Sequence, residues 1–218
     1  MNNMKEVLKQ TKIINSCRGI YGDDLINAMK AIRDGGVKFI DVAYQQDMEN
    51  GIAITTADIK KAKEFFGDSL NIGAGNVMNV EQVELAHSAG ANYIVCPNLD
   101  DEVVKRTKEL GMFSIPGGFT ATEFQKAHKL GADMVMVYPT SCIPAGYLNM
   151  IIGKGPLSHI DLIACGGVNT NNLADFYKQG FSAAVIGQFL ADKESIKKGD
   201  FAELTRRAKL LTEIAQNA

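Results

Sequence analysis

The sequence predicts an α/β protein that folds as a single (β/α)8 TIM barrel over residues 1–218. The chain repeats one unit, in which an amphipathic helical segment is followed by a glycine and a short apolar run. The apolar runs are continuous rather than alternating, which is typical of parallel strands covered on both faces. An open doubly wound sheet is the alternative. Eight such units in 218 residues favour closure into a barrel.

The repeated unit defines the expected elements. Helical segments end at a glycine before an apolar run at 28–36 before 37–42, 83–90 before 93–96, 103–111 before 112–115, 124–131 before 134–138 and 173–180 before 183–186. Glycine just past a helix adopts the left-handed conformation at little cost. Thr120 with Glu123 forms a capping-box pattern, and Asn79 with Gln82 forms a weaker one. We expect strands to begin near Lys12, Val37, Leu70, Tyr93, Met112, Met134, Ile160 and Ala183.

Composition excludes several classes of function. Hydrophobic residues make up 46% of the chain and the net charge is −2, which argues against a nucleic-acid surface. Residues 1–12 are polar and mixed in charge, so we expect no signal peptide, no membrane span and a cytoplasmic location. The four cysteines, at positions 17, 96, 142 and 165, show no C-x-x-C spacing. We predict no metal and no cofactor.

Chemistry in a barrel lies at the carboxyl ends of the strands. Asp41 is a carboxylate inside an otherwise apolar run, which suggests an acid or base, or else an aspartate that is hydrogen-bonded to loop amides or to Arg18. Gly166 and Gly167 precede a predicted helix and indicate a phosphate-binding turn, with a tight turn that binds no ligand as the alternative. Three cysteines (Cys17, Cys96 and Cys165) fall at strand ends and could form a thiol cluster or be ordinary core residues.

Five short motifs in order give the chain a resemblance to a known family. They are Ile72-Gly73-Ala74-Gly75, Val95-Cys96-Pro97, Ile115-Pro116-Gly117, Tyr138-Pro139 and Gly166-Gly167-Val168. In this order they resemble the KDPG/KHG aldolases, which cleave 2-keto-3-deoxy sugar acids. The resemblance implies a homotrimer of barrels and a small keto acid or sugar phosphate as ligand. It also implies class I aldol chemistry, in which a lysine on strand six forms an imine with the substrate.

The resemblance assigns roles to individual positions. Asp41 stands where the family has its proton-shuttling glutamate, and Arg18 matches an arginine at the end of strand one. The positions implied to bind substrate are Gln45, Gly75, Asn76, Pro97, Gly117 and Met136; those implied to bind phosphate are Gly166, Gly167, Gly187 and Gln188. Gln45 replaces an arginine, Asn76 a threonine and Gln188 a serine that many members carry, so the predicted ligand contacts differ from theirs.

The imine-forming lysine is the main departure from the family. The family reads K-x-F-P on strand six, where this chain reads Met136-Val137-Tyr138-Pro139, and a thioether forms no imine. Lys38 falls at the start of a strand and Lys154 in a loop, and neither is a convincing substitute. Three hypotheses remain open: a lyase with altered chemistry based on Asp41 and Arg18, an isomerase or enolising enzyme that uses Asp41, and a non-catalytic protein that binds a sugar acid or phosphate.

Overall fold

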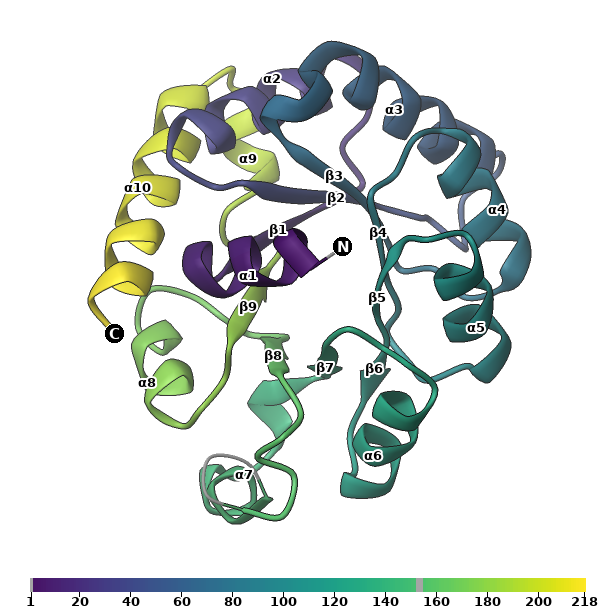
Figure 1. Ribbon diagram of the computed structural model, residues 1–218. Helices are drawn as coiled ribbons and strands as arrows, with labels where there is room; N and C mark the ends of the chain where they lie inside the picture. The colour runs from purple at the N-terminus through teal and green to yellow at the C-terminus, as the bar shows by residue number, and fades with distance from the viewer. Residues whose placement is uncertain (1, 152–154) are drawn as a thin grey trace.

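Parallel strands form a ring at the centre of the molecule (Figure 1). The computed structural model describes residues 2–151 and 155–218. The strands are β1 (Ile13–Arg18), β2 (Phe39–Ala43), β3 (Asn71–Gly75), β4 (Tyr93–Val95), β5 (Phe113–Ile115), β6 (Gly117–Gly118), β7 (Val135–Val137), β8 (Leu162–Cys165) and β9 (Ala183–Ile186). Their order in the sheet is β5-β4-β3-β2-β1-β9-β8-β7-β6, and every pair is parallel. The predicted barrel is confirmed, and the open sheet is not formed.

The ring closes through the segment that contains β5 and β6. Pro116 has no N–H to give to a ladder, and it separates the two strands of what is otherwise one extended stretch. On one side of this stretch the amide of Cys96 donates to the carbonyl of Ile115 (3.1 Å), and on the other the amide of Met136 donates to the carbonyl of Pro116 (2.8 Å). The short strands β5 and β6 therefore act as one strand of the barrel, which pairs with β4 on one side and with β7 on the other. The nine short strands thus make up the eight strands of the barrel.

Helices surround the ring, and one lies across its end (Figure 1). They are α1 (Asn2–Thr11), α2 (Gly22–Asp34), α3 (Gly51–Phe66), η1 (Gly67–Ser69), α4 (Val80–Ser88), α5 (Asp101–Glu109), α6 (Ala121–Lys129), η2 (Thr140–Cys142), α7 (Ala145–Ile151), α8 (Leu173–Lys178), α9 (Lys193–Lys197) and α10 (Phe201–Asn217). The predicted helix-ending glycines are confirmed, for example by φ angles of +89° at Gly90 and +100° at Gly180. The capping box at Thr120 is also confirmed.

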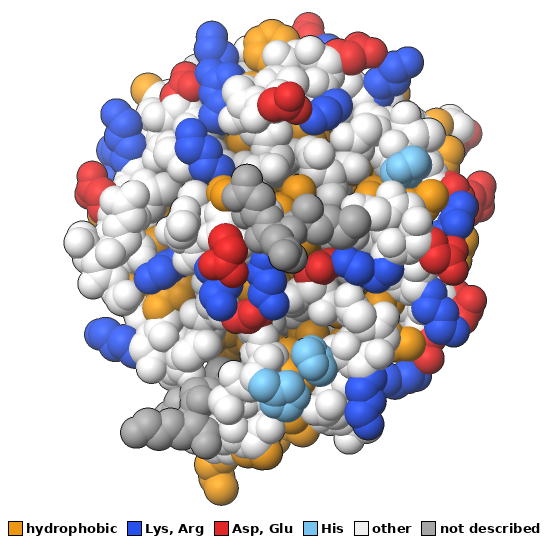
Figure 2. Space-filling view, viewed as in Figure 1, with side chains coloured by type: hydrophobic (Ala, Val, Ile, Leu, Met, Phe, Trp, Pro, Cys, Tyr) orange, Lys and Arg blue, Asp and Glu red, His pale blue; other side chains and the backbone are white. Residues whose placement is uncertain are grey.

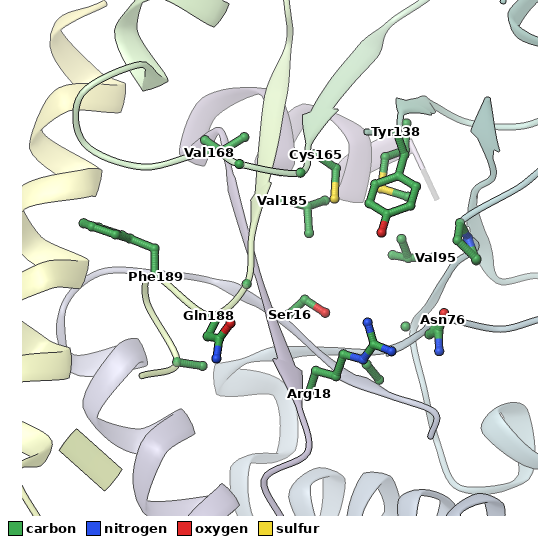
Figure 3. Close-up of a pocket in the computed structure, with 18 of the residues that line it drawn as sticks. Ser16, Arg18, Asn76, Val95, Tyr138, Cys165, Val168, Val185, Gln188 and Phe189 are labelled. Carbon is green, nitrogen blue, oxygen red and sulfur yellow. The ribbon is translucent and has the colours of Figure 1, made fainter. Parts of the chain in front are cut away.

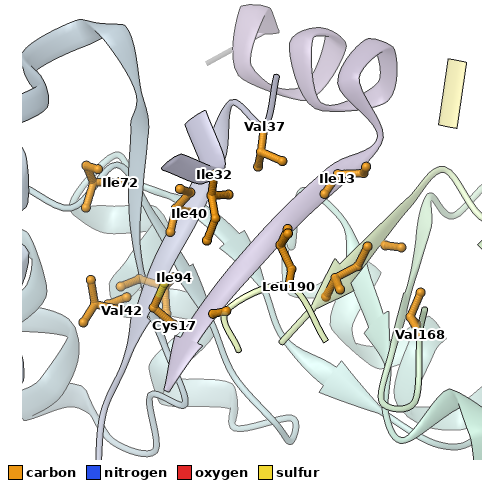
Figure 4. Close-up of a cluster of buried hydrophobic side chains, with 14 of the residues drawn as sticks. Ile13, Cys17, Ile32, Val37, Ile40, Val42, Ile72, Ile94, Val168 and Leu190 are labelled. Carbon is orange, nitrogen blue, oxygen red and sulfur yellow. The ribbon is translucent and has the colours of Figure 1, made fainter. Parts of the chain in front are cut away.

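Two apolar cores divide the interior. The larger one packs between the outer faces of the strands and the helices; Ile13, Ile40 and Ile94 belong to it (Figure 4). The smaller core fills the barrel itself, with Ile14, Phe39, Tyr93, Phe113, Ile115, Met134, Met136, Ile163 and Val185 among its members. Alternate residues of each strand thus point inward and outward.

Helix α1 closes the end of the barrel where the strands begin. Leu8 belongs to the inner core, and Met4 and Val7 pack against it. The ammonium groups of Lys5 and Lys9 lie 2.7 Å and 3.1 Å from the carboxylate of Asp161, just ahead of β8. The apolar face and the ion pairs together hold this helix over the opening.

On the face that α1 covers, basic and acidic side chains are interspersed (Figure 2). This arrangement accords with the small net charge of the chain. Among the helices of residues 2–151 and 155–218, none has both the length and the apolar character that crossing a bilayer requires.

Glycine on β3 is required by close packing inside the barrel. A Cβ atom at Gly73 would lie 2.3 Å from the ring of Tyr93, which is fully buried. The ring therefore occupies the space that any side chain at position 73 would need. The space that Tyr93 occupies therefore explains why the Ile72–Gly75 motif has glycine at position 73.

We expect Gly73→Ala to lower the free energy of unfolding by about 1–3 kcal/mol, because the added methyl group overpacks a rigid interior. Urea unfolding monitored by circular dichroism measures this loss. Gly146→Ala is the matched control, since a Cβ atom at Gly146 in α7 would have no neighbour within 4 Å. Equal midpoints for the two variants would contradict the packing argument.

Candidate functional site

A cavity of about 710 Å³ opens at the carboxyl ends of the strands. Ten of the twelve positions predicted from the sequence line it: Arg18, Gln45, Gly75, Asn76, Pro97, Met136, Gly166, Gly167, Gly187 and Gln188. The other two, Asp41 and Gly117, are buried and do not line it. Strand ends from opposite parts of the sequence therefore converge on one space, as a barrel requires.

Strand β1 places two polar side chains in the cavity. Ile14 points into the barrel core, so the alternation of the strand turns Ser16 and Arg18 to the same side. Figure 3 shows both side chains directed into the space that the labelled residues surround. Arg18 is exposed, and no ion pair within the described residues involves it. Its guanidinium is thus available to an anionic ligand.

Asp41 lies one layer deeper than predicted. The strand register aligns Arg18 with Ala43 and Gly75 at the cavity, and it aligns Ser16 with Asp41 and Gly73 in the layer beneath. The Asp41 side chain is fully buried, and its Oδ1 accepts a hydrogen bond from the Ser16 hydroxyl (2.7 Å). Its Oδ2 has no partner among the described residues. The sequence analysis placed this carboxylate at the mouth of the barrel. The depth of a residue depends on the tilt of the strands, which a sequence does not show.

Burial dominates the electrostatics of Asp41. Loss of hydration raises the pKa of its carboxyl from 3.8 to about 7, and the hydrogen bond from Ser16 opposes this increase. The predicted pairing with Arg18 is not formed; Ser16 is the partner instead. A carboxyl group with a pKa near neutrality can both accept and release a proton under physiological conditions.

Asp41 occupies the space that a side chain at position 75 would need. A Cβ atom at Gly75 would lie 2.1 Å from Asp41 Oδ1, so only glycine leaves room for the carboxylate beneath the cavity floor. Gly75 lines the cavity on its other side. The second glycine of the Ile72–Gly75 motif thus accommodates Asp41.

Two of the amide side chains that line the cavity, those of Asn76 and Gln45, differ in their hydrogen bonding. Asn76 has a φ of +55°, and its Nδ2 donates to the carbonyl of Tyr44 (2.7 Å), so this amide holds the turn. The Nε2 of Gln45 is buried and has no partner among the described residues. An unpaired donor beside a cavity can bind a ligand oxygen. Gln45 is the stronger candidate for contact with a ligand.

Met136, where the family resemblance leads us to expect an imine-forming lysine, lies on β7. Its side chain is buried in the inner core and forms part of the cavity wall. Tyr138, two residues further along, also lines the cavity, and Figure 3 shows its hydroxyl directed inward. Gly117 has a packing role instead, because a Cβ atom there would lie 2.5 Å from the carbonyl oxygen of Pro97.

The turn at Gly166 and Gly167 differs from the prediction. Both glycines have positive φ angles, +93° and +77°, and side chains there would collide with Pro139 and Ser141. The following helix, α8, begins at Leu173, where the predicted helical segment begins, and has six residues, so the glycine pair lies ahead of the helix and does not form its N-terminus. The reason is that Asn169 and Asn172 donate side-chain hydrogen bonds to the carbonyl of Gly167 (3.2 Å and 2.9 Å), which stabilises an extra turn. Among the described residues, no hydrogen bond uses the amide of Gly167.

The three cysteines do not share one mouth. Cys17 and Cys96 point outward into the core beneath the helices (Cys17 in Figure 4), and only Cys165 lines the cavity. Burial raises the pKa of the Cys96 and Cys165 thiols to about 12, so both remain protonated. Within residues 2–151 and 155–218, no three His, Cys, Asp or Glu side chains lie close enough together to hold a metal ion. The core explanation of Cys17 and Cys96 is the correct one.

Lysine 193 was missed by the sequence analysis. Lys193 begins the short helix α9 and lines the cavity. Its ammonium group lies against Gly19, since a Cβ atom there would be 2.5 Å from Nζ. Nothing in the sequence marks it, because the loop after β9 has no motif. Of the lysines considered earlier, Lys38 is exposed and does not line the cavity, and Lys154 lies outside the described residues.

The cavity carries positive charge. Its wall contains Arg18 and Lys193, and none of the described residues that line it is acidic. The carboxyl group of Asp41 is buried rather than part of the wall, and its pKa is about 7. A cavity of this kind in a chain of net charge −2 concentrates anions.

The buried carboxyl group predicts an unusual dependence of stability on pH. The folded protein retains a proton on Asp41 between about pH 4 and about pH 7, where an unfolded aspartate has lost it. We therefore expect the free energy of unfolding to fall as the pH rises through this window, by up to about 4 kcal/mol. Urea unfolding of the wild type and of Asp41→Asn measures it. The advantage of Asp41→Asn over the wild type should grow with pH, and a constant difference would contradict the assignment.

Comparisons with known proteins agree with this geometry. The family model "Aldolase: KDPG and KHG aldolase" matches residues 4–207. The 2-dehydro-3-deoxy-6-phosphogalactonate aldolase of Escherichia coli (strain K12) is 32% identical over 183 residues, covering 83% of this chain and 86% of the relative. The 2-dehydro-3-deoxy-phosphogluconate aldolase of Treponema pallidum (strain Nichols) is 26% identical over 200 residues, covering 92% and 91%.

Solved structures lead to the same family. The native KDPGal structure superposes with a TM-score of 0.82 at 28% identity, and the match covers 94% of each chain. The family model spans most of the chain, and the barrel, the strand-end cavity and the glycine motif all lie within the matched residues. This chain belongs to the KDPG and KHG aldolase family.

Proposed function

We propose that this protein binds an anionic 2-keto-3-deoxy sugar acid in the cavity and cleaves it without a covalent lysine intermediate. The observation that carries the proposal is the cavity itself, which has two basic side chains and no acidic one among its described lining residues. The names of the relatives support this class of substrate, since both are aldolases of phosphorylated 2-dehydro-3-deoxy sugar acids.

Each end of such a ligand has a suitable partner. The carboxylate and keto oxygens suit Arg18 and the unpaired amide of Gln45, because a guanidinium binds planar oxyanions through paired hydrogen bonds. A phosphate suits the free amide of Gly167 and the ammonium of Lys193. These assignments follow from the chemistry of the wall residues.

The proposed cleavage uses Asp41 as the proton acceptor. A proton leaves the hydroxyl group on C4 for Asp41, the bond between C3 and C4 breaks, and the electron pair moves onto the keto oxygen as an enolate. Arg18 stabilises the enolate charge. Return of the proton to C3 gives the keto acid and regenerates the carboxylate. Met136 takes no part in bond making.

A non-catalytic binding protein is the second candidate. It is favoured by the complete burial of Asp41, which does not itself line the cavity. Turnover separates the two functions. Release of pyruvate from a keto-deoxy sugar acid that is abolished in Asp41→Asn supports the lyase, and tight binding without release supports the binding protein. A homotrimer and a cytoplasmic location stay predictions from the family resemblance.

We expect borohydride and pyruvate to leave no covalent adduct on the wild-type protein, because Met136, which lines the cavity, is a thioether at the position where the resemblance implies the imine-forming lysine. Intact-protein mass spectrometry reports any adduct. Met136→Lys is the positive control, since it returns an amine to that position. An adduct on any lysine of the wild type, including Lys154, would restore the ordinary class I mechanism and contradict this proposal.

We expect Lys193→Met to weaken binding of a phosphorylated keto acid by about tenfold or more, because one charge-assisted contact is lost. Isothermal titration calorimetry measures the affinity. Lys197→Met is the matched control, since Lys197 lies on the same helix and does not line the cavity. Equal weakening in both variants would show a general effect of charge rather than a site at Lys193.

A further inference from the structure

Asp41 has no direct contact with the cavity, although the proposed chemistry depends on its carboxyl group. Its side chain is 0% exposed. Ser16 is the residue that connects the two, since its hydroxyl donates to Asp41 Oδ1 at 2.7 Å and the same residue lines the cavity. The register places Ser16 directly beside Asp41 on neighbouring strands, so the pairing is fixed by the backbone.

We propose that Ser16 transfers protons between the bound substrate and Asp41, and is therefore the residue that contacts the reacting atoms. This inference rests on the proposed function, because it concerns the same reaction. The carboxylate of this chain stands on a side chain one methylene shorter than a glutamate at that position.

The step balances without any further reactant. With pyruvate in the cavity, a C3–H bond breaks and its proton binds Ser16 Oγ, while the Ser16 proton moves to Asp41 Oδ1. The electron pair of the C–H bond forms the C2–C3 double bond, and the carbonyl pair moves to the keto oxygen. The products are an enolate and a neutral Asp41, and the reverse step returns a proton from the same hydroxyl.

Other neighbours of Asp41 are poorer links. Gly75 adjoins the carboxylate and lines the cavity, but it has no side chain to carry a proton. Tyr93 is in the same layer, yet it is fully buried and its hydroxyl has no partner among the described residues. Burial also raises the pKa of Tyr93 well above its usual value. Ser16 alone among these residues combines a hydrogen bond to Asp41 with a place in the cavity wall.

Exchange of the pyruvate methyl protons in D2O, followed by proton NMR, tests the relay directly. We expect Ser16→Ala to lower the exchange rate by at least about tenfold, as for loss of a general acid–base group. Ser16→Thr keeps the hydroxyl and should retain most of the rate. Circular dichroism and melting temperature establish that each variant is folded.

Ser182→Ala provides a matched control. The Ser182 hydroxyl donates to Asp161 Oδ1 at 2.9 Å, a serine–aspartate pair of similar length that lies just ahead of β9, away from the cavity. We expect it to leave exchange unchanged. The pH profile adds a further readout: because the Ser16 hydrogen bond lowers the pKa of Asp41, its removal should move the acid limb of the residual exchange to higher pH.

The outcomes separate the two proposals. Exchange by the wild type that persists in Ser16→Ala but is lost in Asp41→Asn overturns the relay and leaves the lyase proposal standing. No exchange by the wild type above the buffer rate overturns the lyase proposal, and the relay with it. The relay is supported if exchange is lost in Ser16→Ala and kept in Ser16→Thr. Combining Ser16→Ala with Asp41→Glu should then restore exchange, because the longer carboxylate reaches the cavity itself.

Discussion

Closure of the sheet through residues 113–118 is the constraint from which the site follows. Once Ile115 and Pro116 accept hydrogen bonds from opposite neighbours, the strands form a ring, and alternate residues of each strand share one interior. The register then sorts these residues into layers. One layer carries Arg18 and Gly75 to the cavity, and the layer below carries Ser16, Asp41 and Gly73. The positions of Arg18, Ser16 and Asp41 are a consequence of this sorting.

Much of this arrangement could be predicted from the sequence. Continuous apolar runs and helix-ending glycines are local signals, and they placed the strands within a few residues of their observed starts. The strand-end rule and the family resemblance together then identified ten residues of the cavity wall, including Met136 and the glycine pair. These predictions succeeded because each depends on chain-local chemistry and on one general property of barrels.

The remainder depends on relations between strands, which a single sequence does not display. The depth of Asp41 and its pairing with Ser16 are set by strand tilt and register. Cys17 and Cys96 turn outward because each lies one residue away from an inward-pointing neighbour. The turn between the glycine pair and α8 is stabilised by asparagine hydrogen bonds to the carbonyl of Gly167. Side chains alternate along β1, so the assignment of Arg18 to the cavity was a signal that Ser16 points the same way. No comparable signal marked Lys193.

The seal that α1 forms over the opposite end of the barrel has a consequence for how protons move. With that end filled by apolar side chains, solvent reaches the neighbourhood of Asp41 from the cavity side. A ligand long enough to fill the cavity would cut the carboxyl group off from bulk water. A proton removed from such a ligand would stay with it and be returned to the same molecule, so isotopic label would be conserved within each turnover. A short ligand leaves water beside Ser16, and its label would wash out.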